Sequence, residues 1–163
     1  MAIRGLNHAV LWVRDAQHST DFYVNVLGFR VVHSMPKAAF LQAATSRNDH
    51  DLGLFTVGDE AADSLAGTGA VGLYHLAWEV TTLADLRECA KRLTEADALV
   101  GSRDHGTTKA LYAKDPDGLE FEICWLVPQD LVDDEMRAYN GELDIEAEIT
   151  RYGEDTPGAY ARI

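Results

Sequence analysis

Two histidines of this chain occupy equivalent positions in an internal repeat. His8 is the third residue of LNHAVLWV at residues 6–13, and His75 is the third residue of LYHLAWEV at residues 73–80. A single histidine in an apolar strand is most often a core residue, but a repeated one calls for a shared role. Because pseudo-twofold pairing of the repeats brings their first strands together, we predict that both imidazoles bind one divalent metal ion.

A glutamate in a later apolar segment can supply the third ligand. Glu122 lies in EFEICW at residues 120–125, where a carboxylate between Phe and Ile is costly to bury unless it is paired or coordinated. Glu120 lies nearer a turn and is expected in solvent, and Glu79 is expected to pair at the rim. Two imidazoles and one carboxylate leave several metal positions open, as in non-haem iron(II) enzymes. Iron(II) is therefore expected, and the same donors also suit manganese or zinc.

The elements that must position these residues repeat as well. Each histidine segment reads as a strand and is followed by a helix, the first begun by Asp15 and the second by Thr82. Three strand-like runs follow each helix, at residues 29–33, 38–43 and 52–57, and then at 99–102, 109–113 and 119–125. We predict an α+β fold in which two βαβββ modules pair into one cupped sheet around the metal site.

The chain divides by composition into a domain and an acidic extension. We predict one domain over residues 1–126, with module 1 at about 1–58, a Gly-rich linker at 59–70 and module 2 at about 71–126. Residues 127–163 form the extension, in which ten acidic and three basic residues supply seven of the thirteen net negative charges. We expect it to be a solvated or partly ordered extension, or else a cover for a pocket or a neighbouring subunit.

The charge and hydropathy exclude several classes of function. A net charge of -13 argues against nucleic acid as a partner, since phosphate binding requires clustered Lys and Arg. No apolar run approaches the roughly 18 residues that span a bilayer, so no membrane partner is expected. Cys89 and Cys124 form no CxxC pair and are expected to pack as small apolar residues. We expect a cytoplasmic protein.

Residues 3–126 resemble the vicinal oxygen chelate superfamily, which includes glyoxalases, bleomycin resistance proteins and extradiol dioxygenases. The resemblance rests on the two Leu-x-His openings, on Phe22-Tyr23 followed by Leu27-Gly28-Phe29, and on Asp115-Pro116-Asp117-Gly118. In that family, the first strand of each module and the last strand of the second carry the metal ligands. The resemblance therefore implies the same set, His8, His75 and Glu122.

Two segments resemble the type I extradiol catechol dioxygenases more narrowly. Residues 105–122 are similar to their signature, although Arg103 stands where a small or aliphatic residue is usual, and residues 48–55 are similar to the strand that supplies an acid/base histidine. The resemblance implies catalytic roles for His50, His105 and Tyr112. It further implies iron(II), a catechol-type substrate and dioxygen, in aromatic hydrocarbon catabolism. We also expect a homo-oligomer.

Other activities of the superfamily remain as alternatives. A glyoxalase-like lyase or isomerase expects a further Glu or Gln ligand on the strand at residues 52–57, which has none. Fosfomycin thiol transferases usually have Thr after the first histidine, where this chain has Ala9. A drug-sequestering protein of the same fold generally lacks the metal histidines. The extradiol dioxygenase is therefore the leading hypothesis.

Overall fold

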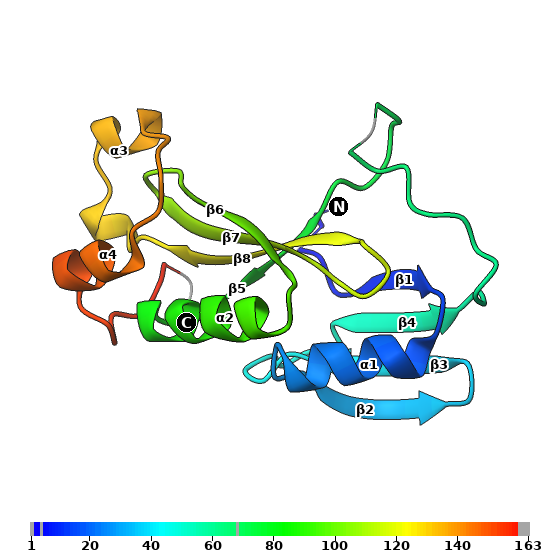
Figure 1. Ribbon diagram of the computed structural model, residues 1–163. Coiled ribbons are helices and arrows are strands. Elements are labelled where there is room, and N and C mark those ends of the chain that lie inside the picture. Colours follow the sequence, from blue (N-terminus) through cyan, green and yellow to red (C-terminus); the bar gives the residue numbers. More distant parts are fainter. Residues whose placement is uncertain (1, 4, 68, 160–163) are drawn as a thin grey trace. The chain divides into compact units, whose positions relative to one another are not determined.

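The computed structural model describes residues 2–3, 5–67 and 69–159, and these fall into two compact units (Figure 1). Unit 1 comprises the described residues up to 64 together with the turn Asp115–Gly118, and unit 2 comprises those of 65–114 and 119–159. Each unit contains one four-stranded sheet and is described below by itself.

Unit 1 is one βαβββ module whose sheet has the order β1-β4-β3-β2. The Asp15 carboxylate caps the helix by accepting from the amides of Gln17 and His18, and α1 packs on β3 and β4. Alternation along β1 leaves Val10 and Trp12 exposed on the face opposite the helix. The elements are β1 (Ala9–Val13), α1 (Ala16–Asn25), β2 (Arg30–Met35), β3 (Ala38–Gln42) and β4 (Leu52–Thr56).

Unit 2 repeats this topology with the sheet order β5-β8-β7-β6. Thr82 and Asp85 form a reciprocal capping box at the start of the helix, as predicted, and α2 packs on β6, β7 and β8 through buried leucines. In both units the first strand pairs in parallel with the fourth. The elements are β5 (Leu76–Glu79), α2 (Leu83–Glu95), β6 (Leu99–Asp104), β7 (Thr108–Lys114) and β8 (Glu120–Leu126). The predicted α+β class with two βαβββ modules is confirmed.

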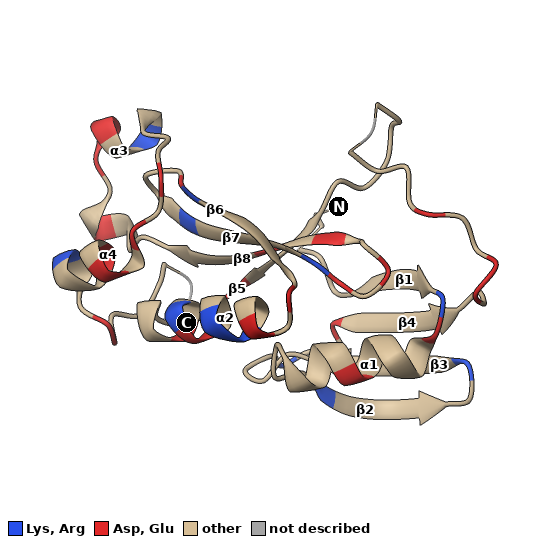
Figure 2. Cartoon of the chain, in the orientation of Figure 1, with Lys and Arg blue, Asp and Glu red and all other residues tan. Residues whose placement is uncertain are grey.

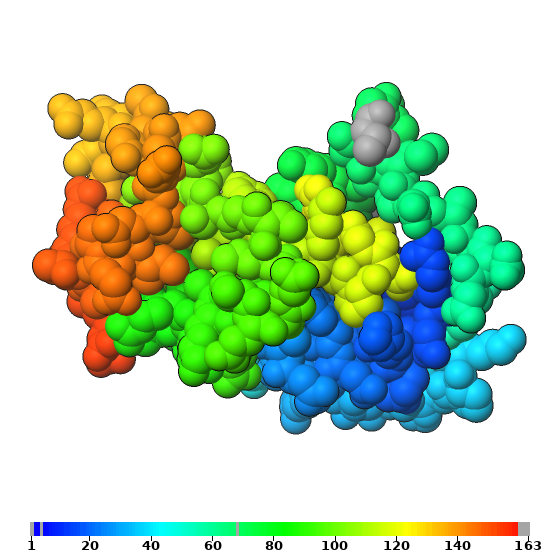
Figure 3. Space-filling model, viewed as in Figure 1, coloured from blue at the N-terminus to red at the C-terminus, as the bar shows by residue number. Residues whose placement is uncertain are grey.

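The chain after β8 is folded against unit 2. It forms a 3-10 turn, η1 (Gln129–Leu131), and two helices, α3 (Asp134–Ala138) and α4 (Ile145–Tyr152), of which α4 packs on α2. In Figure 3 the orange and red atoms of this segment lie against the green atoms of α2. Beyond α4, the Trp125 Nε1 atom donates to the Thr156 carbonyl, and the Gly158 amide donates to the Thr81 carbonyl.

These contacts show that residues 129–159 are folded against unit 2 and not merely solvated, and residues 160–163 of the predicted extension lie outside the described residues. We call residues 129–159 the C-terminal segment. In Figure 2 the ribbon of this segment is red, the colour of Asp and Glu, at intervals along its length. None of the helices in the described part of the chain is long and apolar enough to cross a membrane.

Candidate functional site

Two of the three predicted metal ligands are in contact in unit 2. His75 directly precedes β5 and Glu122 lies within β8, the parallel neighbour of β5. The His75 Nε2 atom is 3.2 Å from the Glu122 Oε2 atom. Glu122 is buried, and Phe121 and Ile123 flank it in the sequence. A carboxylate in such a position was expected to need a partner, and the His75 imidazole is that partner.

Tyr112 and His105 extend this pair along the same sheet. Tyr112 lies opposite Glu122 in the β7–β8 register, and the Tyr112 and His75 rings are 6.0 Å apart. The Tyr112 hydroxyl and His105 Nε2 are joined by a hydrogen bond of 2.8 Å. Burial, followed by the negative charge of Glu122, raises the pKa of Tyr112 above its usual value of 10. The phenol is therefore kept protonated and able to donate.

The remaining candidates, His8 and His50, meet in unit 1. His8 directly precedes β1, as His75 precedes β5, and its ring lies 4.6 Å from that of His50. The Phe40 ring lies 5.0 Å from the His50 ring, and the Asp49 carboxylate lies 2.9 Å from His50 Nδ1. The predicted residues thus assemble as two groups, His8 with His50 in unit 1 and the other four in unit 2.

A buried aspartate fixes the loop that carries His50. Asp51 accepts hydrogen bonds from the Ala43 amide, the Ser46 hydroxyl and the Asn48 side chain, at 2.7 to 2.9 Å. The Asn48 side chain also donates to the Asn7 carbonyl, next to His8. Because a carboxylate with several donors holds a loop in one conformation, Asp51 orders the chain on both sides of the His8–His50 contact. Sequence reasoning did not identify this role.

The donor set in unit 2 fits part of a metal site. Metal–nitrogen and metal–oxygen bonds of about 2.1 Å place adjacent ligands about 3 Å apart in an octahedral geometry, and the His75–Glu122 separation of 3.2 Å agrees. His75 Nδ1 is buried without a hydrogen-bond partner among the described residues. Over those same residues, no three side chains of His, Cys, Asp or Glu lie close enough together to hold an ion.

A buried lysine lies behind this site and was also missed by sequence reasoning. Lys109 in β7 is 1% exposed, and its Nζ atom lies 2.6 Å from Asp104 and 2.9 Å from Glu148. The available signal was a lysine beside Ala110 and Leu111 in a core strand, where a cation requires a carboxylate partner.

Comparisons with known proteins place this chain in a family. Residues 5–123 match the profile of the Glyoxalase/Bleomycin resistance protein/Dioxygenase superfamily. Catechol-2,3-dioxygenase of Bacillus subtilis is 32% identical over 118 residues, which are 72% of this chain and 40% of that protein. Biphenyl-2,3-diol 1,2-dioxygenase 3 of Rhodococcus globerulus is 35% identical over 122 residues, which are 72% of this chain and 61% of that protein. The chain thus spans less than two thirds of the length of either relative.

A solved structure agrees at the level of the fold. The glyoxylase/bleomycin resistance protein/dioxygenase domain from Frankia sp. EAN1pec superposes with a TM-score of 0.61 at 22% identity, over 76% of this chain and 92% of that one. This likeness shows the fold, and the superfamily is shown by the profile match, which extends over both βαβββ modules. The chain belongs to the Glyoxalase/Bleomycin resistance protein/Dioxygenase superfamily.

Proposed function

We propose that this protein is an iron(II)-dependent extradiol dioxygenase that cleaves the ring of a catechol-type aromatic compound with dioxygen. The observation that carries the proposal is the contiguous group of His75, Glu122, Tyr112 and His105, in which a carboxylate–imidazole pair adjoins a second, hydrogen-bonded donor pair. The names of the two curated relatives support the same reaction class, since both are dioxygenases of aromatic diols.

In this proposal His8, His75 and Glu122 hold the iron. When bound, ferrous iron would supply a Lewis acid that favours the deprotonated diol, and it would mediate electron transfer from the diol, which is oxidised, to dioxygen. The buried carboxylate of Glu122 offsets part of the metal charge, while the imidazoles bind in their neutral form. Three protein ligands would leave the other coordination positions of the metal open to the reactants.

His105 and Tyr112 orient the oxygen atoms of the bound reactants. Their mutual hydrogen bond of 2.8 Å fixes each side chain relative to the other, so the pair presents a preformed donor. The raised pKa of Tyr112 preserves its proton at neutral and mildly alkaline pH. Hydrogen bonds from these groups stabilise negative charge as it develops on oxygen.

His50 moves the proton of the diol. An imidazole can take a proton from a catechol hydroxyl with one ring nitrogen and return it later. Asp49 at His50 Nδ1 leaves Nε2 as the nitrogen that exchanges the proton. The Asp51-anchored loop then holds the imidazole where Phe40 and His8 contact it.

A glyoxalase-like lyase is the competing function on the same scaffold. Such an enzyme would need a fourth protein ligand on β4, and β4 reads Leu-Gly-Leu-Phe-Thr. A drug-sequestering protein would not need the His75–Glu122 pair. Neither alternative accounts for the hydrogen bond between His105 and Tyr112.

The proposal is tested by loading the protein with iron(II) without oxygen and then adding oxygen with a panel of catechols, including 2,3-dihydroxybiphenyl. We expect oxygen uptake matched by a yellow ring-fission product. Absence of both with every catechol, at stoichiometric iron, would reject dioxygenation. Disappearance of a thiohemiacetal in a parallel assay would instead identify the lyase.

A further inference from the structure

We infer that the C-terminal segment is a positioning element for His105, and that it acts through the ion-pair chain Glu148–Lys109–Asp104. The inference rests on the proposed function, because it gives a purpose to His105 that only catalysis requires. It also assigns to the acidic segment a role that its charge alone does not indicate.

The two residues that flank His105 are both fixed by the C-terminal segment. Asp104 exchanges two backbone hydrogen bonds with Gly141, of 3.0 and 2.8 Å, in the loop between α3 and α4. Gly106 lies against α3 so closely that a Cβ atom there would be 1.7 Å from the Met136 carbonyl oxygen. The turn that carries His105 is therefore held on either side by groups outside the βαβββ module.

An ion-pair chain provides the third attachment. The Asp104 Oδ1 atom accepts from the Gly106 amide at 2.7 Å and from Lys109 Nζ at 2.6 Å, so one oxygen closes the turn around His105. Lys109 in turn lies 2.9 Å from Glu148 of α4. Because Asp104 and Lys109 are almost fully buried, the pairs are little screened by water and are geometrically restrictive.

The turn also has backbone hydrogen bonds of its own, from the His105 amide to the Thr108 carbonyl, from the Thr107 amide to the His105 carbonyl and from the Val127 amide to the Thr107 carbonyl. It is thus attached both within the module and to the C-terminal segment.

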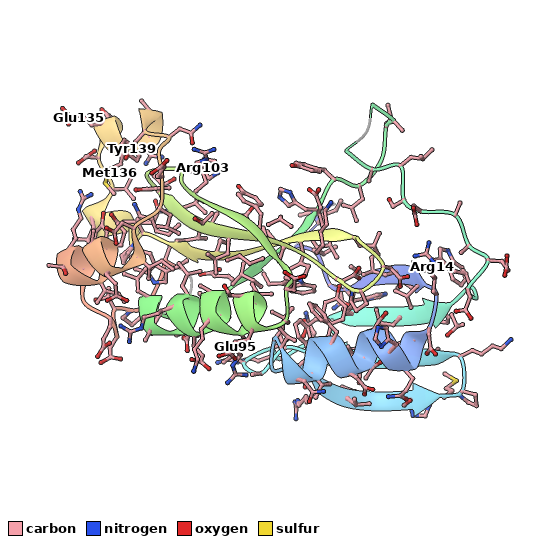
Figure 4. The ribbon with its side chains drawn as sticks, viewed as in Figure 1. Arg14, Glu95, Arg103, Glu135, Met136 and Tyr139 are labelled. Atoms are coloured by element: carbon pink, nitrogen blue, oxygen red, sulfur yellow. The ribbon has the colours of Figure 1, made fainter. Side chains whose placement is uncertain are left out.

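A cavity of about 320 Å³ adjoins this turn and is bordered by Asp104, Lys109, Met136, Tyr139 and Glu148. Figure 4 labels Glu135, Met136 and Tyr139, which lie together at α3. Apolar side chains do not fill this space. The C-terminal segment is therefore connected to the turn by the backbone hydrogen bonds of Asp104, by the close contact at Gly106 and by the ion pairs of Lys109.

One further hydrogen bond links the turn that carries His105 to Tyr112, the other donor of the proposed site. His105 Nε2 is hydrogen-bonded to the Tyr112 hydroxyl, and Tyr112 lies opposite Glu122 in the sheet. A shift of the turn would lengthen that hydrogen bond without displacing His75, which directly precedes β5, or Glu122, which lies on β8. The segment therefore controls the donor pair independently of the metal ligands.

The experiment compares Glu148→Ala with Glu146→Ala in the full chain. Both residues are on α4, but the Glu148 side chain is 12% exposed and contacts Lys109, whereas the Glu146 side chain is 70% exposed and contacts Arg87. We expect Glu148→Ala to lower kcat between about 10- and 100-fold at unchanged iron content and nearly unchanged KM, as slight misplacement of a catalytic group does. Glu146→Ala should match the unmodified protein.

A conservative variant separates positioning from general stability. Glu148→Asp keeps a carboxylate that can pair with Lys109, so it should recover part of the kcat that Glu148→Ala loses, whereas a role in general stability would not depend on the charge. Equal kcat values for Glu148→Ala and Glu146→Ala, at a temperature where both are folded, would overturn the inference.

A readout without turnover keeps the inference separate from the proposed function. The NMR signals of the His105 imidazole nitrogens can be assigned by their loss in His105→Asn. These signals should shift in Glu148→Ala and keep their positions in Glu146→Ala. If the unmodified protein cleaves no catechol, the proposed function fails and these signals alone decide whether the segment positions His105. Unshifted signals in Glu148→Ala would reject the positioning role in either case.

Discussion

The His75 Nε2 and Glu122 Oε2 atoms lie 3.2 Å apart, although 46 residues separate them in the sequence. The parallel pairing of β5 with β8 makes this contact, because it sets the start of β5 beside the start of β8. Parallel strands require a long crossover, and here α2 and the β6–β7 hairpin supply it. The central pair of the proposed site is thus a product of the module topology.

Glu122→Gln should abolish stoichiometric iron binding, since a neutral amide replaces a charged ligand. Loss of a direct ligand should weaken binding by more than about 100-fold, the upper effect of losing an outer-shell partner. Glu120→Gln is the matched control, because Glu120 is two residues away on the same strand and pairs with Lys114 at 3.7 Å. Iron content after gel filtration measures both. Retention of iron by Glu122→Gln would remove Glu122 from the ligand set.

His50→Ala should keep iron and lose turnover by about 10²- to 10⁴-fold, the usual contribution of a general acid or base. His18→Ala serves as the control, because His18 is exposed on α1 and contacts none of the predicted residues. Stopped-flow measurement of ring-fission colour gives the rates, and metal analysis of the same samples gives the iron content. Full activity of His50→Ala would show that another group moves the proton.

Tyr112→Phe should lower kcat by roughly 100-fold, as removal of a preorganised donor does. The raised pKa of Tyr112 means that, in the metal-free protein, the phenol reaches the midpoint of its ionisation only above pH 10. Subtracting the ultraviolet titration of Tyr112→Phe from that of the unmodified protein isolates its ionisation. A phenolate forming below pH 10 would contradict the assignment.

The sequence predicted the His75–Glu122 pair because both signals are local. A repeated Leu-x-His and a carboxylate between apolar residues can be recognised without knowing the fold. The Lys109–Glu148 contact could not be predicted, because it depends on how α4 packs on unit 2, which the sequence pattern does not encode. The acidic composition of the C-terminal segment suggested solvation for the same reason. Its order comes from tertiary bonds, such as that from Trp125 to Thr156.

Cys89 and Cys124 should resist alkylation in the native protein. Burial raises the pKa of the Cys89 thiol to about 11, and burial with the nearby charge of Glu122 raises that of Cys124 to about 12. At pH 8 about one thiol in a thousand or fewer is then a thiolate, the reactive form. A chromogenic disulfide reagent should react slowly with the native protein and with both thiols in urea. Fast reaction of the native protein would mean that the thiols are accessible and more acidic.

Tyr23 should make the protein less stable at high pH. It is buried, and its hydroxyl donates to the Asp115 carboxylate at 3.2 Å within unit 1. Burial, followed by the charge of Asp115, raises its pKa well above 10. Above pH 10 the unfolded chain therefore releases this proton before the folded protein does, so the free energy of unfolding falls as pH rises.

Tyr23→Phe tests this linkage directly. The variant should lose about 2 kcal/mol of stability at pH 7, since a hydrogen bond to a charged acceptor is removed. Its stability should then fall less steeply between pH 10 and 11 than that of the unmodified protein, because the titrating phenol is absent. Urea unfolding across this range measures both effects. Tyr139→Phe, at an exposed tyrosine, should leave the slope unchanged, and equal slopes for Tyr23→Phe and the unmodified protein would show that Tyr23 is not the linked group.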